Sequence, residues 1–293
     1  MNDYACRYIA LISGWRDSLS FINQGKGKVG WLTIQIAPWL GPRSTAIFPA
    51  IRLAQQQVAD MLYDVATVVI QDLGDPLNPP PYRSMHPRNK TVVGARLASA
   101  ALALKFVVEV SADDDGQEIP PANPRWGGPA FQSITRTSAV GFTVKLSRAG
   151  ALRAVGSDNC ADAGPDDNGA TRPASKRCCN APDVFQIWPN ISATEAKRAD
   201  VASSSALCAI AEQELHGRDG SDSASLHCTS TKGTIGDGAV WTFAWQNFPP
   251  CMLMNQAQLP ASPMRAEIPT QAGTRTTVKS KSLASPLKPV GGR

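Results

Sequence analysis

Three residues in the first third of the chain have the side chains of an acyl-transfer site. Asp72 and Asp75 lie close together, and His86 follows after a proline-rich loop. An imidazole beside a carboxylate can take the proton of a serine hydroxyl, because the carboxylate fixes the tautomer and stabilises the imidazolium. The alternative is that His86 only caps a helix or lies on the surface. The spacing of the three residues is compatible with both interpretations.

Two apolar runs and three helical patterns surround these residues. The runs 29–37 and 65–70 are mostly apolar and end in proline or polar residues, which is typical of buried strands. Apolar residues recur at helical spacing in residues 4–14, 47–62 and 93–104. The order helix, strand, helix, strand, helix predicts parallel strands joined by right-handed crossovers.

This order predicts where the candidate residues lie. Pro87 suits the first position of the third helix, so His86 is expected just outside that helix. The loop then lies at the carboxyl end of a strand, where open α/β sheets bind ligands. A complete doubly wound sheet needs more than two strands, so the sheet is expected to be incomplete.

The second half of the sequence has a different character. Short β-type runs such as 140–146 are separated by clusters of Gly, Pro, Asp and Ser. We therefore expect an α/β part in residues 1–108, a linker in 109–124, a β-rich part with long loops in 125–265, and a disordered basic tail in 266–293.

The positive charge of the chain is concentrated at its C-terminal end. The formal net charge is +5, and residues 264–293 hold six basic residues against one acidic residue. The rest of the chain is therefore close to neutral, which argues against a nucleic-acid-binding surface on the folded part. No apolar run is long enough to span a membrane. Neither nucleic acid nor a membrane span is expected.

The seven cysteines suit disulfides better than a metal site, because none falls in a C-x-x-C pattern with a second pair or histidines. Their concentration after residue 159 predicts a disulfide-linked β-rich half in an oxidising compartment. The candidates are Cys160, Cys178, Cys179, Cys208, Cys228 and Cys251.

Two further features bear on the compartment. Asn190-Ile191-Ser192 is a glycosylation sequon consistent with secretion, and Asn89-Lys90-Thr91 is a second sequon in a less suitable position. The N-terminus has no basic and apolar regions of a signal peptide. A secretory cysteine pattern without a leader leads us to expect that the chain starts within a longer protein.

The segments IQDLGDP (70–76) and SMHPRNKTVVGARLASAALAL (84–104) resemble the motif that closes the SGNH-type hydrolase domain of sialate O-acetylesterases. Residues 11–16 and 32–39 resemble the family's Trp-Arg helix end and its following strand. Residues 240–261 resemble its terminal β segment. The resemblance covers roughly residues 4 to 265 in order, with a loose match over 147–230.

The resemblance implies an incomplete SGNH-type doubly wound sheet and a carboxylic ester hydrolase that removes O-acetyl groups from sialic acids or related carbohydrates. It implies that His86 is the catalytic base. Arg83 stands where many SGNH enzymes have the aspartate, so the partner of His86 is Asp75 or Asp72, or the enzyme works as a dyad. No cofactor or metal is implied. A secreted or lysosomal location is expected.

The nucleophile is the main departure from the family. Neither the family's Gly-Glu/Gln-Ser-Asn block nor a Gly-x-Ser-x-Gly elbow occurs in the chain. The glycine-flanked serines Ser157 and Ser221 lie in low-complexity segments and are interpreted as turns. We therefore expect the chain to be nearly inactive as it stands. The alternative is a non-catalytic relic, or a carbohydrate-binding remnant, of such an enzyme.

Overall fold

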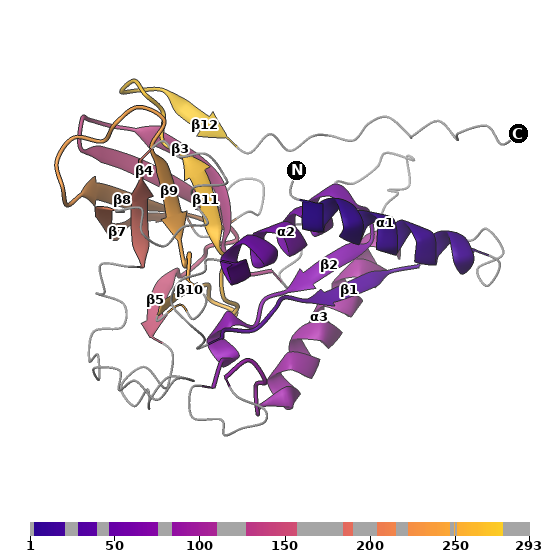
Figure 1. Cartoon of the computed structure of the whole chain (residues 1–293). Helices are drawn as coiled ribbons and strands as arrows, with labels where there is room; N and C mark the ends of the chain where they lie inside the picture. Colours follow the sequence, from indigo (N-terminus) through magenta and orange to yellow (C-terminus); the bar gives the residue numbers. More distant parts are fainter. Residues whose placement is uncertain are drawn as a thin grey trace, which may run out of the picture.

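The computed structural model describes most of the chain. It covers residues 3–20, 29–39, 47–75, 84–109, 127–156, 184–189, 204–214, 222–246, 249 and 251–277. Residues 110–124 of the expected linker lie outside these ranges, whereas Glu109 is the last residue of a helix. The described residues form an α/β part and a β-rich part, which lie side by side (Figure 1).

The α/β part contains the expected alternation of helices and strands. Its elements are α1 (Asp3–Ser18), β1 (Trp31–Ile34), α2 (Ile47–Met61), β2 (Val65–Val68), the short 3₁₀ helix η1 (Gln71–Leu73) and α3 (Lys90–Glu109). β1 and β2 pair in parallel, with Trp31 opposite Val65 and Ile34 opposite Val68. Figure 1 shows α1 and α2 on one side of this pair and α3 on the other. Among the described residues this parallel sheet has two strands, and a wider doubly wound sheet is not shown.

Two helix ends differ from the expected positions. α1 continues past Gly14 to Ser18, because Arg16 in its last turn donates to the carbonyl oxygens of Val29, Tyr63 and Asp64 at 2.8–3.2 Å. These bonds tie the last turn of the helix to the residues that immediately precede the two strands β1 and β2.

The third helix begins at Lys90 and not at Pro87. The Oδ1 atom of Asn89 accepts a hydrogen bond from the backbone N–H of Val92 at 3.3 Å. Asn89 is therefore the N-cap of α3, because a short polar side chain can satisfy a backbone N–H group of the first turn. His86 does not have this capping role.

The β-rich part is built from antiparallel strands. They are β3 (Ala130–Arg136), β4 (Gly141–Ser147), β5 (Arg153–Gly156), β6 (Phe185–Trp188), β7 (Ser204–Glu214), β8 (Ser223–Ser230), β9 (Val240–Phe243), β10 (Cys251–Met254), β11 (Met264–Glu267) and β12 (Arg275–Thr277). Eight of them form a sheet in the order β11-β9-β6-β7-β8-β4-β3-β12, and β5 pairs with β10. The fold is thus a mixture of helices, one parallel strand pair and antiparallel sheets.

The largest hydrophobic core belongs to the β-rich part. Alternate residues of β4 and β8 point to one face, where Phe142 lies opposite Cys228 and Val144 lies opposite Leu226. All four side chains are buried, as the period of two along a strand requires when one face of a sheet is covered. The fully buried Trp241 of β9 packs near Phe185 of β6.

The β-rich part extends further than the sequence analysis predicted. Residues 266–293 were expected to be a disordered tail, yet β11 continues to Glu267 and β12 pairs with β3. The buried Arg136 explains the ordered connection, because its guanidinium donates to the carbonyl oxygens of Pro269 and Thr270 at 3.2–3.3 Å. Residues 278–293 of the expected tail lie outside the described ranges.

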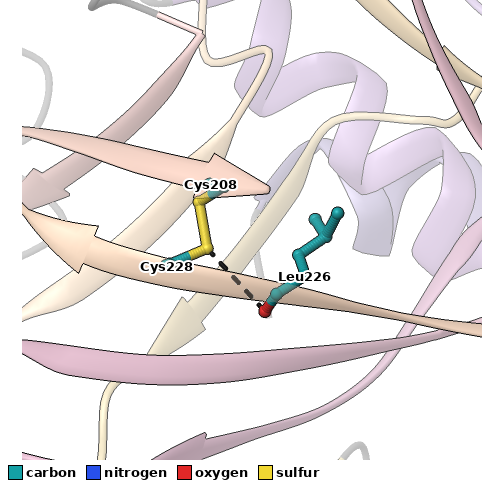
Figure 2. Close-up of a disulfide and its surroundings, with 3 residues drawn as sticks. All are labelled: Cys208, Leu226 and Cys228. Atoms are coloured by element: carbon teal, nitrogen blue, oxygen red, sulfur yellow. Dashed lines mark hydrogen bonds between the residues drawn. A yellow bond between two sulfur atoms is a disulfide. The ribbon is translucent and has the colours of Figure 1, made fainter. Parts of the chain in front are cut away.

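A disulfide joins Cys208 of β7 to Cys228 of β8 (Figure 2). The two residues lie directly opposite each other in the strand register. The Cys228 sulfur is 4.0 Å from the carbonyl oxygen of Leu226; a disulfide sulfur carries no proton, so this is a contact and no hydrogen bond is donated. Cys251 is also disulfide-bonded, and Cys6 is a free, exposed thiol. The expectation of disulfides in the β-rich half is confirmed for Cys208 and Cys228.

Candidate functional site

The candidate residues lie where β2 ends and α3 begins. η1 follows β2 after two residues and contains Asp72. The backbone N–H of Asp75 then donates to the carbonyl oxygen of Ser84 at 3.2 Å. This bond brings the two ends of the proline-rich loop together, so that the turn with Ser84 and His86 starts beside Asp75. The carboxyl end of the parallel strand therefore places these residues in one region.

Asp72 is engaged by an arginine of α3. Its Oδ1 and Oδ2 atoms accept hydrogen bonds from Nη1 and Nη2 of Arg96 at 2.7 and 2.6 Å. Both side chains are only 11% exposed. Arg96 also donates to the carbonyl oxygen of Val69 at 3.0 Å. A bidentate pair of this kind is strong and directional, so Asp72 fixes α3 against the end of β2.

Asp75 is the more deeply buried of the two aspartates in the loop. Its residue surface is 6% exposed, and its Oδ2 atom accepts a charge-assisted hydrogen bond from Nε of Arg88. His86 lies on the surface, followed by the buried Pro87. The structure thus brings Asp75 and the His86 turn together and gives Asp72 a separate role.

Buried polar side chains connect this region to the β-rich part. Gln71, next to Asp72, donates from Nε2 to Oε1 of Gln35 at 3.1 Å and to the carbonyl oxygen of Ala261 at 3.5 Å. Gln35 donates in turn to Oγ of Ser262 at 2.8 Å. The Oε1 atom of Gln71 is buried without a hydrogen-bond partner among the described residues. Ala261 and Ser262 of the β-rich part therefore lie beside Gln71 of η1 and Gln35.

Arg52 of α2 makes a second connection between the two parts. It is fully buried, and its guanidinium donates to the carbonyl oxygens of Ile36, Ala37 and Gln246 at 2.9–3.0 Å. Burial lowers the pKa of Arg52 to about 9. The side chain therefore remains charged at neutral pH, and three backbone acceptors compensate for the water that it has lost.

Sequence reasoning did not identify Gln35, Gln71 or Arg52. The sequence did contain a signal for buried polar residues. Gln35 interrupts an apolar run, and Arg52 lies next to the apolar residues of the predicted helix 47–62. A polar residue in such a position needs a buried partner. The partners Ser262, Ala261 and Gln246 are about 190 or more residues further along the chain, so no local pattern could indicate them.

Among the described residues, the structure does not identify a nucleophilic serine. Ser84 is buried, and Ser157 and Ser221 lie outside the described ranges. Within the part of the chain that the structure describes, no cluster of three or more His, Cys, Asp or Glu residues could hold a metal ion. No helix found in the same residues is long and apolar enough to cross a membrane.

Comparisons of the chain with models of protein families, with curated proteins and with solved structures find no match. Its function must therefore be argued from its own residues and their geometry.

Proposed function

We propose that the chain carries the base side of a sialate O-acetylesterase-like active site, of SGNH type, that removes acetyl groups from sialic acids or related carbohydrates. One observation carries the proposal: the Asp75–Ser84 backbone bond sets the His86 turn beside a buried carboxylate. The parallel pair β1–β2 supports it, because the turn follows the carboxyl end of β2. The motif of residues 84–104 supports it independently.

The proposed chemistry is acyl transfer. A serine oxygen attacks the acetyl carbonyl carbon, and His86 takes the serine proton. His86 then gives that proton to the leaving sugar oxygen when the ester bond breaks, and water releases acetate from the serine in a second step. Asp75 is the preferred orienting carboxylate, because Asp72 is already bound at both oxygens by Arg96. No metal or organic cofactor takes part.

The proposed location is an oxidising compartment, either outside the cell or in a lysosomal or endomembrane lumen. The Cys208–Cys228 disulfide supports this location, since disulfides persist in such compartments and are rare in the cytosol.

A second candidate function is non-catalytic carbohydrate binding. The observation in its favour is that both aspartates contact arginines: Asp72 binds Arg96, and Asp75 binds Arg88. Ion pairs of this kind also occur as structural ties in proteins without catalytic function. No recognisable nucleophile motif occurs in the chain.

The most direct test is to sequence the transcript upstream of the Met1 codon. An in-frame Gly-x-Ser-Asn block there is the expected result, and a verified start at Met1 without such a block would favour the non-catalytic function. If the block is found, the longer chain should hydrolyse O-acetylated sialic acid, and His86→Ala should reduce kcat by at least about 10³-fold. Asp75→Asn should lower kcat more than Asp72→Asn does.

The 293-residue chain provides a complementary test. Purified chain should release no acetate from O-acetylated sialic acid, or from a generic acetyl ester, above a His86→Ala control. His86-dependent turnover by this chain would show that it does contain a nucleophile. Serine-to-alanine variants would then identify it, beginning with Ser84 because it is nearest to His86 in sequence and continuing with Ser18, Ser157 and Ser221.

A further inference from the structure

Arg88 is held at one end and exposed at the other. Its Nε atom donates to Asp75, whose side chain is 8% exposed, while the Arg88 side chain is 65% exposed. No hydrogen bond or ion pair with a described residue involves its Nη1 and Nη2 atoms. Because the guanidinium is planar, the contact at Nε orients the two terminal nitrogens. Arg88 thus presents an oriented pair of N–H donors to solvent.

The surroundings of this pair of donors favour an anion. Lys90, two residues further on, is exposed and begins α3. The first turn of this 20-residue helix contains no acidic residue, so the positive end of the helix dipole is not offset there. Asp75 compensates one positive charge, and Asp72 is neutralised by Arg96. Among the described residues around this turn, the positive charges therefore exceed the negative charges by the charge of Lys90.

The same turn holds the proposed catalytic base. His86 and Arg88 flank the buried Pro87, whose ring restricts the backbone between them. A ligand bound by the Arg88 nitrogens is therefore held by a residue that is only two positions from His86 in the sequence. Two parallel N–H donors match the two oxygens of a carboxylate, and sialic acids are sugars that carry one.

From this arrangement we propose that Arg88 binds the carboxylate of the substrate and selects acetyl esters of acidic sugars over those of neutral sugars. The proposal rests on the proposed function, since it assigns the substrate class of that same site. Asp75 then has a second role, because it fixes the guanidinium in the orientation that binding requires.

The test is a direct binding measurement that needs no turnover. The probes are the α-methyl glycoside of N-acetylneuraminic acid and the C1 methyl ester of the same compound, which lacks the free carboxylate. Binding of each to the 293-residue chain is measured by isothermal titration and saturation-transfer NMR. We expect the acid to bind at least about tenfold more tightly than the ester, a difference of about 1.4 kcal/mol.

Three variants separate recognition from folding. Arg88→Gln removes the guanidinium, and Arg88→Lys keeps a positive charge near Asp75 but lacks the planar pair of donors. Both should bring the Kd of the acid to within about twofold of that of the ester. Lys90→Gln removes a neighbouring exposed charge and should preserve most of the preference. Circular dichroism of each variant checks that the fold is retained.

The possible outcomes distinguish the two proposals. If the wild type binds acid and ester equally, or if folded Arg88 variants keep the preference, Arg88 is not the carboxylate-binding residue and the proposed function stands. If Lys90→Gln abolishes the preference as fully as Arg88→Gln does, only general charge attraction is at work, and the Arg88 assignment is wrong. If the wild type binds neither probe, Arg88 does not hold the carboxylate and this proposal fails, whereas the proposed function is decided separately by turnover of the longer chain.

Discussion

Removing the Cys208–Cys228 disulfide should destabilise the β-rich part by about 3 kcal/mol. The bond closes a loop with a sequence separation of 20 residues. For a loop of that length, the chain-entropy relation gives a loss of about 11 cal/mol/K in the unfolded state, which is about 3.3 kcal/mol at 25 °C. Cys208 and Cys228 are already opposite each other in a backbone ladder, so the folded strands should keep their pairing without the bond.

The perturbation is the double variant Cys208→Ala/Cys228→Ala, measured by urea unfolding under non-reducing conditions at low protein concentration. Substitution is preferable to a reducing agent, because a reductant would also open the disulfide of Cys251. The midpoint should fall, and the denaturant slope should rise because the unfolded chain becomes less compact. Cys6→Ala is the matched control, since Cys6 is a free and exposed thiol, and it should change stability by less than about 0.5 kcal/mol.

A loss below about 1 kcal/mol in the double variant would refute the loop-entropy argument for this disulfide. A loss of the same size in Cys6→Ala would show that cysteine substitution as such, and not the missing loop, causes the effect.

Two further predictions follow from the α/β part. Leu32 and Ile34 are 37% and 43% exposed on β1, which among the described residues pairs only with β2. The purified chain should therefore self-associate, and the variant Leu32→Lys/Ile34→Lys should do so less in size-exclusion chromatography with light scattering. A monodisperse wild type would contradict this. Replacing Arg96 by Leu leaves the largely buried Asp72 carboxylate, 11% exposed, without its bidentate partner and should cost about 3 kcal/mol in thermal or urea unfolding. Asp3→Ala, which removes a surface pair with side chains about 80% exposed, should cost less than about 0.5 kcal/mol, and equal losses in these two variants would refute the role of burial.

The helices and strands of the α/β part could be predicted because their signals are local. The run 65–70 and the helical spacing in 47–62 correspond to β2 and α2 within a few residues. The parallel pairing of β1 with β2 followed from the order of the elements. The C-terminal strand β12 was missed, because the tail around Arg275 has the composition of a disordered segment.

The candidate site could be predicted only as a set of residues. Side-chain chemistry and the turn after a strand pointed to Asp72, Asp75 and His86. The different roles of the two aspartates depend on which arginine each one meets. Arg96 lies 24 residues from Asp72 in sequence, and nothing in the spacing assigns it to Asp72 and not to Asp75.

The sequence by itself determined the alternation of helices and strands, the β character of the second half and the chemical types available for a site, because periodicity and turn chemistry act over a few residues. The tertiary structure alone decided that β12 joins the sheet, that Asp72 is tied to α3, and that Gln35 and Gln71 hold the β-rich part against η1. These are pairings of buried polar groups between distant segments. Burial forces such groups to find partners, but only the folded chain determines which partners are within reach.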